Sequence, residues 1–256
     1  HHIRFYREYQ LTEDVKALEE TKKREKIEIE LFEKADVGHV VGSYEQKILQ
    51  EKFRDRYPNK PIRNIPLYIY DQLPNNINKD FSTRKDILFV GGFNHAPNID
   101  AVLWFAKEIF PVLLKRYADL RWHIVGSNAP QEVRNIECDN IILEGFVNDQ
   151  RLEELYEKCR MAVVPLRYGA GVKGKVVEAA YYQIPLVTTS IGGEGLDTES
   201  NAFVIEDNAS EMASRIIHLY TDYEALRKMS DAGKAFIQKY FTTNAAKEVL
   251  LKDMEI

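Results

Sequence analysis

The sequence contains few cysteines and no long apolar run. Cys138 and Cys159 are its two cysteines, and neither lies in a C-x-x-C motif or near a group of histidines. This pattern indicates neither a disulfide framework nor a Cys/His metal site, and it is typical of a reducing cytoplasm, where we expect both thiols to be buried. No apolar run approaches the roughly 18 residues that a membrane-spanning helix needs, and no signal peptide is visible. The contact with a membrane that remains open is a peripheral one, made by a longer form of the protein.

The sequence also lacks an excess of basic residues. Its 35 Lys and Arg are outnumbered by 40 Asp and Glu, which gives a formal net charge of -5. A nucleic-acid partner is therefore excluded, because it would require a basic domain or stripe. A length of 256 residues with 45% apolar side chains is sufficient for a globular protein with a substantial core.

The first third of the chain reads as two helices and two short strands. Residues 12–35 contain strong helix formers with charge pairs at i,i+4 and no Pro or Gly, which predicts a long exposed helix. A strand over 37–41, a helix from Ser43 to about Phe53 and a strand over 62–65 follow. This is too little sheet for an independent domain. Residues 71–85 combine Pro, Asn, Asp and Ser, which favours an exposed connection at a domain boundary.

The rest of the chain alternates apolar strands with helices. The strands are predicted over 87–91, 121–126, 141–145, 161–166, 185–189 and 202–206, and the helices over 98–117, 149–158, 173–182 and from 209 to the end. Nearly continuous Ile, Leu, Val and Phe runs between helices indicate a parallel sheet covered on both faces. The fold class is therefore α/β, a doubly wound Rossmann-like domain with a partial second α/β segment. Ligands of such sheets bind outside the carboxyl ends of the strands.

One loop at that rim, GAGVKGKVVE over 169–178, satisfies three phosphate-site patterns at once. A dinucleotide fingerprint should follow the first strand of its sheet and be answered by an acidic residue after the next strand, and neither condition holds. A P-loop requires Ser or Thr after its lysine to bind magnesium, but this position is Val176.

The third pattern is a site for a nucleotide diphosphate. Lys173 and Lys175 lie at the predicted start of a helix, where the positive end of the dipole disfavours a cation by about 0.3–1 kcal/mol, so an anion should offset them. The glycines would let a diphosphate approach the free backbone N–H groups. Glu178, one turn after Lys175, could accept hydrogen bonds from a ribose diol. A simple Lys175–Glu178 pair in an ordinary glycine loop is the alternative.

Several segments together resemble the C-terminal nucleotide-sugar domain of the GT-B glycosyltransferases of family 4 (group 1). The segments that carry the likeness are VGGFNHAPNIDAVLWF, RWHIVGS, IILEGFVND, LEELYEKCRMAVVPLRYGAGVKGKVVEAAYYQIPLVTT and IGGEGL, within about residues 85–256. FEKADVGHVVGSYEQKIL and the strand that ends before Pro66 resemble the closing part of the family's N-terminal domain. The resemblance implies four segments, which are a remnant of the acceptor-side domain over 1–75, a linker over 76–85, the donor domain over 86–243 and a helix over 244–256 that returns toward the N-terminal part.

The resemblance also implies roles for individual residues. Glu178 matches the second glutamate of the family's E-x7-E motif, which holds the ribose, and Arg167 matches the arginine of its glycine turn. The residues implied to bind the donor are Gly92, Gly145, Phe146, Val147, Arg167, Gly169, Gly171, Lys173, Gly174, Lys175 and Glu178. Glu178, Lys175 and Lys173 are the candidate catalytic residues, because preorganised cations stabilise the charge that develops on a leaving diphosphate.

The sequence departs from the family pattern at the first position of E-x7-E, which is Ala170. The family's N-domain histidine could correspond to His1 at the edge of the chain, and His95 is the other candidate, although we expect His95 to be an exposed loop histidine. We expect Tyr181 and Tyr182 to pack rather than to stack on a ligand. No cofactor is implied, and no His/Cys/Asp cluster is available for a metal.

The resulting hypothesis is a retaining, metal-independent glycosyltransferase that uses a nucleotide-sugar donor and an unknown sugar, polysaccharide or lipid-linked acceptor. The chain begins with His1-His2 inside an amphipathic segment, so we expect a piece of a longer protein that transfers sugar poorly by itself. Two other hypotheses stay open. One is a binding module for NAD or ATP, and the other is a non-catalytic subunit with a glycosyltransferase fold, which Ala170 favours.

Overall fold

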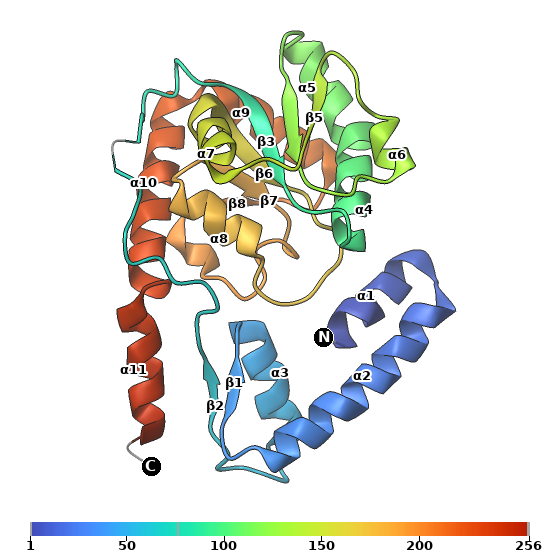
Figure 1. Cartoon of the computed structure of the whole chain (residues 1–256), viewed down its shortest axis with the longest axis vertical. Helices are drawn as coiled ribbons and strands as arrows, with labels where there is room; N and C mark the ends of the chain where they lie inside the picture. Colours follow the sequence, from blue (N-terminus) through green and yellow to red (C-terminus); the bar gives the residue numbers. More distant parts are fainter. Residues whose placement is uncertain (1, 76, 255–256) are drawn as a thin grey trace.

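The computed structural model describes residues 2–75 and 77–254, which form an upper α/β part and a smaller N-terminal part below it (Figure 1). The N-terminal part begins with the helices α1 (His2–Thr12) and α2 (Val15–Lys34), which pack side by side. The single long helix predicted from residue 12 is therefore wrong at its start. Glu13 adopts a left-handed φ of 58°, and Asp14 caps α2 by accepting from the Lys16 N–H at 2.9 Å, so the chain turns sharply between the two helices.

The N-terminal part also contains the strands β1 (Gly38–Val40) and β2 (Ile62–Asn64), separated by α3 (Ser43–Phe53). The two strands pair in parallel, with Gly38 opposite Ile62. Phe32 of α2 stacks on Phe53 with 4.2 Å between the ring centroids, and Ile62 completes this small core.

The upper part is built on six parallel strands in the order β5-β4-β3-β6-β7-β8. They are β3 (Lys85–Val90), β4 (Trp122–Val125), β5 (Ile141–Gly145), β6 (Cys159–Val164), β7 (Leu186–Thr188) and β8 (Val204–Ile205). The chain first adds β4 and β5 on one side of β3 and then β6, β7 and β8 on the other. The α/β doubly wound fold class is confirmed, and the strand order reverses between β3 and β6.

Helices cover both faces of this sheet. They are α4 (Ala96–Trp104), α5 (Phe110–Arg116), α6 (Gln131–Arg134), α7 (Asp149–Lys158), α8 (Gly174–Tyr181), α9 (Ala209–Thr221), α10 (Tyr223–Tyr240) and α11 (Thr243–Met254). Two short segments are a π-helix, η1 (Phe105–Ile109), and a 3-10 helix, η2 (Thr198–Ser200). Along β3, Ile87 and Phe89 enter the core layer under α5 and α9, and Leu88 enters the layer under α8 and α10, as the two-residue period of a strand requires.

The helix predicted over 98–117 is interrupted by the π-helix η1. Pro111 lies directly after it and has no backbone N–H, so it cannot donate to the preceding turn. A widened turn over Phe105–Ile109 accommodates this loss while Phe105, Ile109 and Phe110 all stay fully buried.

The end of the chain returns along the N-terminal part. Helices α10 and α11 descend beside the sheet, and α11 ends next to β1 and β2 (Figure 1). Asp253 near its end accepts from the Arg63 guanidinium and contacts the His39 ring at 2.7 Å. Thr243 at its start donates its backbone N–H to Asp71 at 2.7 Å.

Two expectations about the surface were also checked. Cys159 is buried as expected, but Cys138 is exposed, because it lies in the short irregular segment between α6 and β5. No helix within residues 2–75 and 77–254 is both long and apolar enough to cross a membrane.

Candidate functional site

The predicted loop lies at the switch point of the sheet. The segment from Leu166 to Lys173 leaves the carboxyl end of β6, and Gly91 and Gly92 leave the neighbouring end of β3. The ends of β3 and β4 approach closely here, because a Cβ on Gly126 would overlap the carbonyl oxygen of Gly91. In doubly wound sheets this crevice is the general ligand position.

Lys175 lies at the centre of this crevice. Its ammonium donates to Asn98 Oδ1, lies 4.7 Å from the centre of the Phe89 ring and touches the backbone of Gly91, where a Cβ would collide with it. Asn98 Nδ2 donates to the Gly92 carbonyl at 2.7 Å. Burial, and to a smaller degree the charge of Lys173, lowers the pKa of Lys175 to about 7. The structure therefore brings Gly92 and Lys175 together, as predicted.

Glu178 lies on α8, one turn after Lys175, and accepts from the Tyr156 hydroxyl at 2.9 Å. Burial raises the pKa of Glu178, and the hydrogen bond from Tyr156 and the charge of Lys175 partly offset this rise. Tyr182 stacks on Tyr156 at 4.3 Å and Tyr181 stacks on Tyr70 at 4.2 Å, so both tyrosines pack as expected. A pair of oppositely charged, partly buried side chains on one helix turn is suited to a ligand with a phosphate and a diol.

Lys173 differs from its predicted position inside the helix. It is the N-cap residue of α8, with φ -91° and ψ 108°, and its side chain is buried. The ammonium donates to the Gly171 carbonyl and lies 3.6 Å from Glu194 Oε2. Its charge is therefore already balanced within the protein, whereas Lys175 has only the neutral Asn98 as a hydrogen-bond partner among the described residues.

Glu194 joins the loop to helix α1. It accepts from Arg7 Nη1 at 2.9 Å and from Arg7 Nη2 at 2.6 Å, and Arg7 also donates to the Gly169 carbonyl at 2.8 Å. A bidentate Arg–carboxylate pair of this kind fixes both position and orientation. Arg7 therefore holds the N-terminal part against the glycine loop.

Other predicted residues lie farther from Lys175. The Arg167 guanidinium is exposed and pairs with Asp100. Gly145 has a left-handed φ of 67° at the end of β5, and Phe146 is 83% exposed. Val147 packs against the core layer under α8. Their donor-binding roles stay predictions.

The two histidine candidates have different outcomes. His1 lies outside the described residues. His95 is not the exposed loop histidine that we expected, because it is the half-buried N-cap residue of α4, with its Nδ1 3.5 Å from Arg4 Nη1. Burial and the nearby charges of Arg4, Lys175 and Lys173 lower its pKa to about 4. His95 is therefore neutral at pH 7.

Sequence reasoning missed Arg7, Asn98, Tyr156 and Glu194. Glu194 lies in IGGEGL, a segment that carried part of the resemblance but had no assigned role, and Asn98 follows the first glycine loop. Position in a motif could therefore have suggested these two. No sequence signal pointed to Arg7, because it reaches the loop from a distance of 162 residues along the chain.

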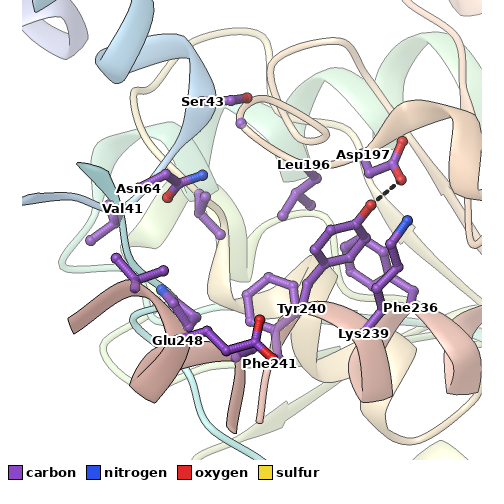
Figure 2. A pocket seen from close by; sticks show the side chains of 15 residues that line it. Val41, Ser43, Asn64, Leu196, Asp197, Phe236, Lys239, Tyr240, Phe241 and Glu248 are labelled. Atoms are coloured by element: carbon purple, nitrogen blue, oxygen red, sulfur yellow. Dashed lines mark hydrogen bonds between the residues drawn. The ribbon is translucent and has the colours of Figure 1, made fainter. Parts of the chain in front are cut away.

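A separate cavity of about 500 Å³ lies below the sheet, between β1, the start of α3, the loop over Gly195–Asp197 and the ends of α10 and α11. Figure 2 shows Tyr240 beside Asp197, whose carboxylate accepts from the Tyr240 hydroxyl at 2.6 Å, opposite Val41 and Asn64. None of the predicted donor-binding residues lines it. This cavity separates the N-terminal part from the C-terminal helices and is distinct from the crevice at Lys175.

A metal centre has no ligands to build on in the part of the chain that the structure describes. No group of three His, Cys, Asp or Glu side chains within it could hold an ion. The charges available at the crevice are instead the ammonium groups of Lys175 and Lys173.

The fold and this crevice define a protein of the GT-B type. The sequence model described as "Glycosyl transferases group 1" matches residues 84–222, which is more than half of the chain. The chain belongs to this family of glycosyltransferases.

Similar proteins of known sequence come from bacterial polysaccharide gene regions. An uncharacterized 44.6 kDa protein of the cps region of Klebsiella pneumoniae is 25% identical over 66% of this chain and 45% of its own length. The O-antigen biosynthesis glycosyltransferase WbnH of Escherichia coli is 25% identical over 70% of this chain and 50% of its own length. The chain thus spans about half the length of these relatives.

Solved structures share the fold. TarM of S. aureus superposes with a TM-score of 0.71 at 18% identity, covering 90% of this chain and 46% of TarM. The pneumococcal O-GlcNAc transferase GtfA superposes with a TM-score of 0.62 at 20% identity, covering 85% of this chain and 46% of GtfA.

Proposed function

We propose that this chain carries the donor-binding half of a glycosyltransferase, in which the crevice at Lys175 binds the diphosphate and ribose of a nucleotide-sugar. The observation that supports this most directly is the position of the Lys175 ammonium. It lies at the switch point of the sheet, between the Gly91–Gly92 turn and the first turn of α8, and its only hydrogen-bond acceptor among the described residues is neutral. A diphosphate would supply the missing negative charge.

Glu178 completes the proposed site. Its carboxylate lies one turn along α8 from Lys175 and is held by Tyr156. A ribose whose 5′ oxygen carries the diphosphate could then place its diol against this carboxylate. The printed names of related structures agree with such a ligand, since both TarM and GtfA were crystallised with UDP.

The proposed reaction transfers the glycosyl group to a hydroxyl of an acceptor. The bond between the anomeric carbon and the diphosphate oxygen breaks, a bond from the anomeric carbon to the acceptor oxygen forms, and the acceptor's proton leaves with the diphosphate. Lys175 and the N–H groups of α8 would stabilise the charge that develops on the leaving group. We infer retention of configuration and independence of metal from the family resemblance, and a glycan or lipid-linked acceptor from the O-antigen relative.

Calorimetric titration with UDP, GDP, ADP, NAD and ATP with Mg²⁺ tests this proposal. We expect one nucleoside diphosphate to bind without metal, and we expect Glu178→Ala to weaken it at least about tenfold, or about 1.4 kcal/mol. Glu154→Ala, on the exposed face of α7, is the matched control and should leave the affinity unchanged.

Two outcomes would contradict the proposal. Tightest binding of NAD or of ATP with Mg²⁺ would identify an adenine-cofactor module instead. Binding of no nucleotide would show that the crevice is not a donor site. If a diphosphate binds, release of nucleotide from the matching nucleotide-sugar measures transfer, which we expect to be slow for this chain by itself.

A further inference from the structure

The carboxylate of Glu45 is an unsatisfied polar group beside the glycine loop. Glu45 lies in the first turn of α3, and its Oε2 is buried without a hydrogen-bond partner among the described residues. A buried acceptor without a partner costs about 1–3 kcal/mol, so such a group in a native structure calls for an explanation, of which a binding role is one.

Glu45 reaches out of the N-terminal part toward the loop that precedes α8. A Cβ placed on Gly171, whose φ is 76°, would lie 3.1 Å from Glu45 Oε1. The start of α3 is pressed against a second loop, because a Cβ on Gly42 would lie 3.5 Å from the Cα of Gly195. The Glu45 carboxylate is therefore held between α3 and the loop whose far end carries Lys175.

Glu45 is also the carboxylate beside this loop that has capacity for a ligand. The loop over 169–174 contains no acidic residue, and position 170 is alanine. The other nearby carboxylate, Glu194, is occupied by Arg7 and Lys173. Burial and the charge of Glu194 raise the pKa of Glu45, and its own backbone N–H and the charge of Lys173 partly offset this rise.

We propose that Glu45 hydrogen-bonds hydroxyl groups of the sugar of the donor, so that the N-terminal part takes part in recognising the glycosyl group. The inference rests on the proposed function. A diphosphate at Lys175 would place the attached sugar on the side of the loop that faces α3. A carboxylate accepts hydrogen bonds from adjacent sugar hydroxyls, and this would satisfy the Glu45 oxygen that lacks a partner.

The test separates the sugar from the nucleotide. We would titrate the wild type and Glu45→Ala with the nucleoside diphosphate selected above and with its commercial sugar derivatives, such as UDP-glucose, UDP-galactose and UDP-GlcNAc for UDP. Glu45→Gln keeps the shape of the side chain and serves if Glu45→Ala loses its cooperative thermal transition. Glu51→Ala, on the exposed part of α3, is the matched control.

We expect Glu45→Ala to leave the affinity for the diphosphate within about twofold and to weaken the tightest-binding sugar derivative about tenfold, or about 1.4 kcal/mol. Equal affinities of wild type and variant for the sugar derivative, or an equal loss for both ligands, would overturn the inference, because Glu45 would then be satisfied by solvent or act only in folding. Absence of diphosphate binding to the wild type would instead contradict the proposed function, so the two failures are distinguishable.

Discussion

At the scale of single residues, the crevice shifts two pKa values toward neutrality from opposite sides. Burial lowers the pKa of Lys175 to about 7 and raises the pKa of Glu178. Burial penalises the charged form of either group, so both shifts report that the crevice is poor in water. Perturbed groups in such a position are candidates for ligand binding rather than for stability.

The shift of Lys175 predicts uptake of a proton when a diphosphate binds. At pH 8 the free Lys175 is mostly neutral, and a bound diphosphate raises its pKa because it favours the ammonium. We therefore expect uptake of up to about one proton at pH 8, and an affinity that falls as the pH rises from 6.5 to 8.5. Calorimetry in buffers of different ionisation enthalpy measures the uptake.

Lys175→Met should abolish this uptake, and Lys107→Met is the control because Lys107 is exposed on the surface at η1. An unchanged proton uptake in Lys175→Met would show that another group, or the nucleotide itself, takes the proton.

At the scale of secondary-structure elements, the crevice depends on the close approach of β3 and β4 at their carboxyl ends. Gly126 donates its backbone N–H to Gly145 at 2.9 Å, and Gly91 donates to Val125 at 2.8 Å. Side chains at this end would separate the strands. The glycines are needed here for contact between backbones rather than for a left-handed φ.

We predict that Gly126→Ala destabilises the protein and Gly92→Ala does not. The new Cβ at Gly126 would overlap the Gly91 carbonyl oxygen, and relief of such overpacking costs about 1–3 kcal/mol. At Gly92 the nearest atom is Ser127 Oγ at 3.7 Å, which is an ordinary contact, so the free energy of unfolding should change by less than about 0.5 kcal/mol. Urea denaturation of both variants measures this difference, and equal stabilities would contradict it.

At the scale of the whole molecule, the N-terminal helices depend on a few polar contacts with the upper part. Helix α1 has no fully buried side chain. It packs along α2, and Arg7 links it to Glu194 and Gly169. Helix α11 provides a second connection through Asp253, which binds His39 and Arg63.

We predict that Arg7→Met loosens α1 without affecting the sheet. Loss of the bidentate pair leaves Glu194 with Lys173 alone, and α1 should exchange its amide hydrogens roughly fivefold to thirtyfold faster, as expected for a loss of about 1–2 kcal/mol of local stability. Hydrogen exchange followed by mass spectrometry measures this, with β3 to β7 as internal reference. Arg24→Met, which removes an exposed pair with Glu20, is the control and should change little.

Much of the fold could be predicted because its information is local. The strands at residues 87, 122, 141, 161 and 186 were found from apolar runs, and the parallel sheet followed from their alternation with helices. The breaks were not found. Pro111 turned one expected helix into three segments, and Glu13 separated α1 from α2, because backbone strain and packing at single residues outweigh helix propensity there.

The candidate site divides in the same way. Lys175, Glu178 and the glycines lie in one short motif, and the crevice contains them as predicted. Arg7, Asn98, Tyr156 and Glu45 come from four other elements, and Lys173 is paired rather than available. Pairing of charges depends on distance in space, which spacing along the chain does not contain.

The sequence by itself determined the class of the fold, the family and the motif at which a donor would bind, because hydrophobic periodicity and the spacing within one loop are properties of neighbouring residues. Only the tertiary structure decided which charges in that motif are free. The six-stranded sheet sets Lys175 against Gly91 and Asn98, while α1 and α3 bring Arg7 and Glu45 to the loop from the far end of the chain. Burial and pairing arise from that packing, and they distinguish a lysine that can bind a ligand from one that holds the fold.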